Sequence, residues 1–159
     1  MDTITASGRP FKVRRARLDD VAAIMALMAD DPLGATREPA DPAPYEAAFH
    51  EIEADPNHFL AVVTQGDVVV GTLQLTIIPG MSRGGTKRLQ IEGVRIAGHA
   101  RRLGLGVAVM EWAHEFGVCH GARLAQLTSD RQRPDAHRFY ERLGYVPSHV
   151  GFKRPLMGD

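Results

Sequence analysis

Residues 101–106 have the composition of an anion-binding turn. Arg101 and Arg102 precede Gly104 and Gly106, and the apolar residues that follow recur with the spacing of a helix. The amino end of a helix carries partial positive charge and free N–H groups, and glycine lets an anion approach them closely. The sequence therefore predicts a phosphate site at this turn.

The spacing of these glycines distinguishes among the known kinds of nucleotide-binding loop. The dinucleotide fingerprint requires a third glycine where Val109 stands, and no Gly-Lys-Ser/Thr sequence of a triphosphate-binding loop follows. NAD and ATP are therefore disfavoured as ligands.

The remaining pattern, Arg101-x-x-Gly104-x-Gly106, resembles the Q/R-x-x-G-x-G/A signature of the GNAT superfamily of N-acetyltransferases. Residues 91–96 upstream and residues 138–145 downstream also match that family in order and spacing, and 138–145 resembles its second cofactor motif. The resemblance extends over about residues 11–154. It implies transfer of an acetyl group from acetyl-CoA, the co-substrate, to a primary amine, for which we expect a small molecule. There are two alternatives. The acceptor could be a lysine or the N-terminus of a protein, or the chain could be a CoA-binding sensor without turnover.

The same resemblance implies contacts to the cofactor. The pantetheine arm would pair with the main chain of Val94 and Ile96, and Arg101 would add a charge-assisted bond to the phosphates. Arg133 stands where family members often have asparagine, and we assign it to the CoA phosphates as well. The pyrophosphate would lie on the backbone of a continuous run: Arg102, Leu103, Gly104, Leu105, Gly106 and Val107.

Two residues are candidates for proton transfer. Similarity to the family makes Tyr140 the general acid for the departing thiolate; the alternative is a core aromatic residue one turn from Leu143. Glu92 lies where the amine must attack and would accept its proton directly or through water. The alternative for Glu92 is a solvated carboxylate on a strand.

A change of phase in residues 87–96 indicates a β-bulge next to Glu92. Leu89 and Ile91 are apolar at odd positions, whereas Val94 and Ile96 are apolar at even positions. One extra residue at Glu92–Gly93 accounts for the shift. By the resemblance, the bulge would help to splay the fourth strand from the fifth.

The periodicity along the chain predicts a mixed α/β (α+β) fold with a central, mostly antiparallel, twisted sheet of six or seven strands and about four helices. Residues 1–10 are expected to be a flexible leader before a single domain, 11–159. The proline-rich segment 30–44 is either a mobile loop over the site or an ordinary connector. Strands are expected at 11–16, 59–64, 68–78, 87–96 and 123–128, with two closing strands at 145–146 and 150–154; helices are expected from 21, at 45–54, at 106–118 and from 134.

Bulk composition limits the class of protein. Lysine plus arginine and aspartate plus glutamate both number 19, so no general attraction to nucleic acid or to an anionic membrane is expected. The single cysteine, Cys119, and the absence of a long apolar run predict a soluble cytoplasmic protein. His114-Glu115 lacks the second histidine of a zinc helix, so no metal is expected. The oligomeric state stays open, a homodimer included.

Overall fold

The computed structural model of this chain describes residues 1–30 and 38–156. Part of the proline-rich segment, residues 31–37, lies outside the described residues, so the two interpretations of that segment stay open. The chain divides into two compact units, Met1–Gln126 and Leu127–Asp159, and each is described by itself.

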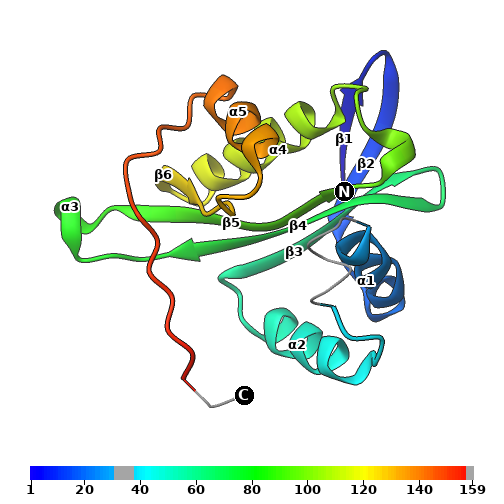
Figure 1. Ribbon diagram of the computed structural model, residues 1–159, viewed down its shortest axis with the longest axis horizontal. Coiled ribbons are helices and arrows are strands. Elements are labelled where there is room, and N and C mark those ends of the chain that lie inside the picture. The colour runs from blue at the N-terminus through cyan, green and yellow to red at the C-terminus, as the bar shows by residue number, and fades with distance from the viewer. Residues whose placement is uncertain (31–37, 157–159) are drawn as a thin grey trace. The chain divides into compact units, whose positions relative to one another are not determined.

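The first unit is built on a six-stranded sheet in which the strands lie in chain order (Figure 1). Successive strands from β1 to β5 are antiparallel. The strands are β1 (Asp2–Ala6), β2 (Arg9–Arg15), β3 (His58–Gln65), β4 (Val68–Ile78), β5 (Lys87–Ile96) and β6 (Ala122–Leu127).

The last strand, β6, follows β5 in the same direction. Lys87 Nζ at the start of β5 lies 3.5 Å from the carbonyl oxygen of His120, just ahead of β6. Farther along both strands, Gln126 Nε2 donates to Gln90 Oε1 at 2.7 Å. A helix joins these two parallel neighbours, as a crossover connection requires. The mixed, mostly antiparallel sheet predicted from the sequence is confirmed.

Strand β1 was not expected, because residues 1–10 were interpreted as a flexible leader. Instead it forms a hairpin with β2, in which Ile4 pairs with Phe11. Ser7 and Gly8 both have positive φ, as a tight hairpin turn requires. The strand is also tied to a distant helix, since Trp112 Nε1 donates to Asp2 Oδ2 at 2.8 Å. Its few apolar positions are too short a pattern to identify a strand without its partner.

Helices cover both faces of the sheet in this unit (Figure 1). On one face α1 (Val21–Ala29) packs on β4 and β5, and α2 (Ala43–Ala54) packs on β3. On the other face α4 (Leu105–Cys119) packs on β1 and β5. The shorter helical segments are η1 (Leu18–Asp20), α3 (Ser82–Gly85) and η2 (Gly98–Ala100).

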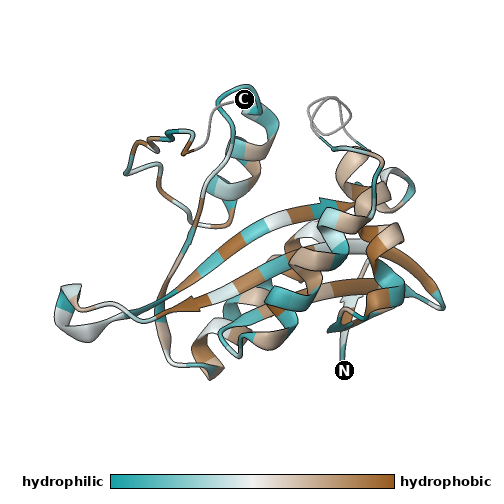
Figure 2. Cartoon of the chain, turned by 90° about the horizontal axis from the view of Figure 1, so that it is seen from below, coloured by the Kyte–Doolittle hydropathy of each residue, from teal (hydrophilic) through white to brown (hydrophobic). Residues whose placement is uncertain are grey.

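Apolar residues, coloured brown in Figure 2, lie along the strands. Successive side chains of a strand point to opposite faces of the sheet, so these residues supply apolar side chains to both helical layers. Leu60 and Val62 are buried with Ile24 of α1 and Phe49 of α2. On the opposite face the helix α4 lies very close to β5. A Cβ added at Gly117 would lie 2.9 Å from Leu89 Cδ2, so this approach requires glycine.

A partly buried ion pair lies at the start of α1. Arg14 donates to both carboxylate oxygens of Asp20, at 2.6 and 2.9 Å. Asp20 Oδ2 also accepts from the backbone N–H of Arg17 at 2.7 Å. These bonds, first of all the one from Arg14, lower the pKa of the Asp20 carboxyl.

The second unit contains α5 (Pro134–Arg142), which begins with proline in its first turn as the sequence predicts. Gly144, with a φ of 87°, follows the end of the helix. Its last carbonyls accept from the N–H groups of Gly144 and Tyr145. The closing strands predicted at 145–146 and 150–154 are wrong for the structure of this chain, in which residues 145–156 form no strand. A strand pattern forms a strand only where a partner strand is available to pair with it.

Candidate active site

The predicted bulge lies on β5 beside Glu92. Thr72 pairs with Arg95 and Gln74 pairs with Glu92, so two steps along β4 match three steps along β5. Gly93 has a φ of 60°, the left-handed conformation that glycine tolerates at a bulge. The phase shift in the sequence therefore located an irregularity that the register confirms.

Beyond the bulge, the main chain of β5 alternates between its two neighbours. Ala97 donates its N–H to the carbonyl of Val70 on β4 at 2.9 Å. By alternation, the main-chain groups of Ile96 and Val94 face away from β4, on the side of β6. However, β6 ends one residue after Gln126, which is bonded to Gln90, whereas β5 continues to Ile96. The last residues of β5 thus extend past the end of β6.

The carbonyls on this part of β5 already have one partner each. Val94 O accepts from Arg95 Nη1 at 2.9 Å, and Ile96 O accepts from Arg101 Nε at 2.8 Å. A carbonyl oxygen has two lone pairs, so the carbonyls of Val94 and Ile96 can each accept a second hydrogen bond from a ligand.

The turn before α4 presents an open helix end. Arg102 has a φ of 63° and Gly104, the N-cap of α4, has a φ of 73°. Within Leu105–Cys119 no side chain caps the amino end and no acidic residue lies in the first turn. A Cβ built on Gly104 would have no atom within 4 Å. The turn therefore has neither a side-chain cap nor an acidic neighbour in the first turn to exclude an anion, and in these respects it fits a pyrophosphate group such as that of acetyl-CoA.

Arg101 is bound to the protein itself. Besides its bond to Ile96, its Nη2 donates to the carbonyl of Asp30 at 3.1 Å and lies 3.0 Å from Asp30 Oδ2. The turn is held from its other side as well, because Ser7 Oγ donates to the carbonyl of Leu103 at 2.9 Å. Neither Asp30 nor Ser7 carried a local sequence signal, since both contacts join segments far apart in the chain. Arg102 is exposed, as Arg101 is.

Glu92 is exposed and belongs to a polar strip on the sheet face that carries α1 and α2. Alternation within strands and the register between them place a row of polar side chains from β3, β4 and β5 on this face, and the bond from Gln126 to Gln90 adds one from β6. Three cross-strand contacts link members of the strip: His58 Nδ1 to Thr76 Oγ1 at 2.9 Å, His58 Nδ1 to Gln74 Nε2 at 3.4 Å, and Gln126 to Gln90. The strip consists of His58, Gln74, Thr76, Gln90, Glu92 and Gln126.

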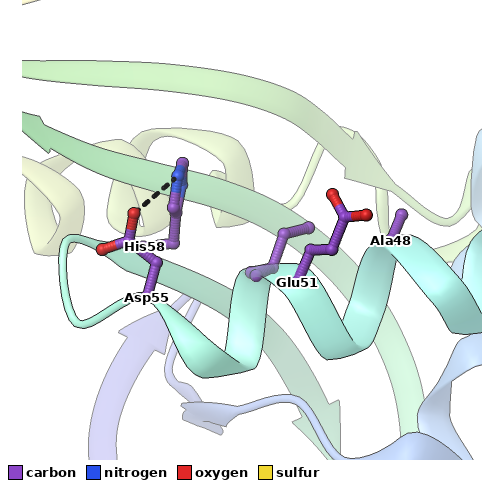
Figure 3. Close-up of a pocket in the computed structure, with 5 residues that line it drawn as sticks. Ala48, Glu51, Asp55 and His58 are labelled. Atoms are coloured by element: carbon purple, nitrogen blue, oxygen red, sulfur yellow. Dashed lines mark ion pairs between the residues drawn. The ribbon is translucent and has the colours of Figure 1, made fainter.

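A hollow of about 380 Å³ adjoins the strip at His58 (Figure 3). Helix α2 lines it with Ala48, Glu51 and Ile52, and Asp55 follows the helix. The Oδ2 atom of Asp55 lies 3.7 Å from His58 Nε2. The strip gives the sheet face a polar surface around Glu92. The sequence alone did not identify this surface, because it depends on the register of the strands.

In the second unit, Tyr140 lies on α5 among aromatic side chains. Its ring centre is 5.3 Å from that of Phe139 and 5.9 Å from that of Tyr145. Burial, followed by the charge of Tyr140, raises the pKa of Tyr145 to about 12. Arg133 occupies the N-cap position of α5 and forms no side-chain cap there, in contrast to what asparagine can do.

The described residues also bear on metal binding and on membrane insertion. Over residues 1–30 and 38–156, no group of three or more His, Cys, Asp and Glu side chains is placed to hold a metal ion. No helix within the same ranges is long and apolar enough to cross a membrane.

Comparison with known proteins identifies the family. Residues 22–145, which include parts of both units, match the model of the acetyltransferase (GNAT) family. Aminoalkylphosphonate N-acetyltransferase of Salmonella typhimurium is 27% identical over 146 residues, which are 91% of each chain.

Solved structures agree with this fold. A protein of Bacillus halodurans, described as a transcriptional regulator, superposes with a TM-score of 0.88 and 42% identity over 92% of this chain and 99% of its own. Glucosamine-6-phosphate N-acetyltransferase of Arabidopsis thaliana has a TM-score of 0.74 and 20% identity over 92% and 99%, a likeness of fold. The chain belongs to the acetyltransferase (GNAT) family and is an acyltransferase.

Proposed function

We propose that the chain transfers the acetyl group of acetyl-CoA to a primary amine of a small molecule, by direct attack in a ternary complex. The observation that carries this proposal is the uncapped amino end of α4 behind two left-handed residues, Arg102 and Gly104. Such a turn without its own acidic cap is suited to a pyrophosphate group.

In this proposal the pyrophosphate binds the backbone amides from Arg102 to Val107. The exposed side chain of Arg102 supplies a charge-assisted bond, while Arg101 acts on the turn through Asp30 and Ile96. The pantetheine arm pairs with Val94 and Ile96, whose main-chain groups face away from β4. We keep Arg133 as a proposed contact to the CoA phosphates.

The reaction requires one proton to leave the amine and one to reach the thiolate. The neutral amine attacks the thioester carbonyl, whose oxygen accepts from the N–H of Val94. Glu92 accepts the proton released by the amine, directly or through water, and its exposed position on the polar strip favours this role. Tyr140 gives its proton to the sulfur as the carbon–sulfur bond breaks.

The small-molecule acceptor is supported by the relative that acetylates aminoalkylphosphonates and by the hollow beside the polar strip. Two alternatives have support as well. A lysine or N-terminus of a protein could reach the same exposed face. A CoA-binding sensor without turnover is the second alternative: a relative described as a transcriptional regulator favours it, whereas membership in the acetyltransferase family favours an enzyme.

The test combines binding with turnover. We expect CoA to bind with measurable heat and to raise the melting temperature, because a ligand specific to the folded state stabilises it. Absence of both effects at millimolar CoA would overturn the proposal. A screen of thiol release over amino acids, polyamines, aminoglycosides, aminoalkylphosphonates and peptides then identifies the acceptor. Binding without any turnover supports the sensor, and turnover on peptides alone supports a protein acceptor.

A further inference from the structure

The bulge on β5 brings two side chains of opposite charge to one face of the sheet. In an uninterrupted strand, residues three apart point to opposite faces. Here Glu92 pairs with Gln74 and Arg95 pairs with Thr72, and these two partners are only two residues apart on β4. The extra residue in β5 therefore places Arg95 on the face that carries Glu92.

This face lies toward α1 and α2. Thr72 pairs on its other side with Val62, which is buried in the cluster formed with those helices. Thr72 carries no charge, and its hydroxyl donates to the carbonyl of Ala61 at 2.8 Å. Arg95 is half-buried beside it. A guanidinium stays charged at any physiological pH, so a half-buried one on this face suits a site that receives an anion.

A bond to the main chain orients the guanidinium. The Nη1 atom of Arg95 donates to the carbonyl of Val94 at 2.9 Å. Val94 is also the residue whose N–H is proposed to bind the oxygen of the thioester. The planar guanidinium has five N–H donors, so it can keep this bond while it binds two oxygens of one anion. The positive charge of Arg95 is thus held next to the proposed position of acetyl transfer.

We propose that Arg95 binds an anionic group of the acceptor, a carboxylate or a phosphonate, while the amine of the same molecule faces Glu92. The inference rests on the proposed function, because it concerns the acceptor of that same site. The partners of Glu92 and Arg95 are two residues apart, so the two positions are about 7 Å apart along the strand. A short amine with an anionic end can span this distance, and its two charges are opposite to those of the two residues.

The test compares acceptors that differ in charge at the end away from the amine. The pairs are β-alanine with β-alaninamide, and aminoethylphosphonate with ethanolamine. The wild-type chain should have a kcat/KM about ten- to a hundredfold higher for the anionic member, which corresponds to the strength of charged hydrogen bonds. Arg95→Gln should bring this ratio close to one. The pair with the larger ratio identifies the anion that the site prefers.

Arg88→Gln is the matched control. Arg88 lies on the same face of β5, since it alternates with Gln90 and Glu92, and it is half-buried as Arg95 is. It pairs with Ile78 at the opposite end of the strand, so the same substitution there should leave the ratio unchanged. The dissociation constant of CoA verifies that both variants are folded.

Calorimetry with the CoA-loaded chain detects the anion site without turnover. Arg95→Gln should weaken binding of the preferred anionic amine by a similar factor. Turnover of amines without preference for the anionic members, or a preference that Arg95→Gln leaves unchanged, overturns the inference and leaves acetyl transfer intact. Binding that requires Arg95 in a chain that acetylates no amine supports the anion site and overturns the proposed reaction. Absence of both binding and turnover overturns both.

Discussion

Arg101 binds Asp30, so the turn that precedes α4 is joined to the end of α1. The Nη2 atom of Arg101 lies 3.0 Å from Asp30 Oδ2 and 3.1 Å from the carbonyl oxygen of Asp30. The same guanidinium donates through Nε to the carbonyl of Ile96 on β5. This arginine therefore connects a strand, a helix and the proposed phosphate turn, and we expect it to influence cofactor binding through the position of that turn.

We expect Arg101→Ala and Asp30→Ala to raise the dissociation constant of CoA by similar factors, roughly two- to tenfold, as befits an exposed pair with added hydrogen bonds. The double variant should bind no more weakly than Arg101→Ala alone, because both changes remove one interaction. Calorimetry measures all three constants. A large loss for Arg101→Ala with none for Asp30→Ala would show that Arg101 contacts the phosphates directly.

Gly104→Asp should nearly abolish CoA binding while leaving the chain folded. The added side chain has space, since no atom lies within 4 Å of a Cβ at this position, but it puts a negative charge where the anion must approach. Left-handed backbone at a φ of 73° also costs about 1–2 kcal/mol for a residue with a side chain.

Gly66→Asp is the matched control for the cost of placing aspartate in the left-handed backbone conformation. Gly66 has a φ of 60° in the turn between β3 and β4 and also has no atom within 4 Å of a built Cβ. Both variants should lose similar melting temperature, and only Gly104→Asp should lose affinity. Unchanged affinity in folded Gly104→Asp would mean that the phosphate binds elsewhere.

Tyr140→Phe should lower kcat by about ten- to a thousandfold with little change in the dissociation constant of acetyl-CoA. The lost hydroxyl serves the departing thiolate more than binding of the ground state. The ring stays, so its contacts with Phe139 and Tyr145 should persist. Steady-state kinetics on an identified acceptor, combined with calorimetry, checks both quantities. Wild-type kcat in this variant would remove Tyr140 from the mechanism.

Glu92→Gln should slow the reaction most at neutral pH, with a deficit that shrinks as pH rises toward the acceptor pKa of about 10. At that pH the amine is already neutral and needs no base. A pH profile of kcat/KM for the variant and the wild type measures this difference. A deficit that is constant with pH would mean that Glu92 positions the amine and takes no proton from it.

Asp20→Asn should destabilise the fold by about 2 kcal/mol at pH 7, because it removes a charged hydrogen-bond acceptor from Arg14 and leaves the guanidinium half-buried. The pKa of Asp20 is lowered in the folded state, so its contribution is complete above the unfolded value near 4. It is lost as pH falls through the lower folded pKa. The difference in unfolding free energy between the two proteins should therefore shrink in acid.

Asp19→Asn is the control for that comparison, because Asp19 is the exposed neighbour of Asp20. Urea unfolding should detect a change within about 0.5 kcal/mol for this variant. Equal losses for the two substitutions would point to a general charge effect at the start of α1.

Local patterns in the sequence determined much of the first unit. The change of phase between Ile91 and Val94 located the bulge, because alternation of side chains has a fixed period of two and an extra residue must shift it. Arg101, Gly104 and Gly106 located the open helix end, because glycine and helix geometry act over a few residues. In the second unit, Pro134 marks the first residue of α5 and Gly144 follows shortly after its last residue, Arg142, for the same reason.

Contacts between distant segments were decided by the tertiary structure. Strand β1 is held by contacts with residues elsewhere in the chain: Asp2 accepts a hydrogen bond from Trp112, and Ile4 pairs with Phe11. The residues next to Asp2 and Ile4 in the sequence do not indicate these contacts. The bond from Arg101 to Asp30 spans 71 positions, and the polar strip that holds Glu92 exists only once the register of its strands is fixed. Residues 150–154 have the sequence pattern of a strand but form no strand in this chain. The pattern determines only which face of a strand would be apolar, whereas a strand forms only where the edge of another strand is available for pairing.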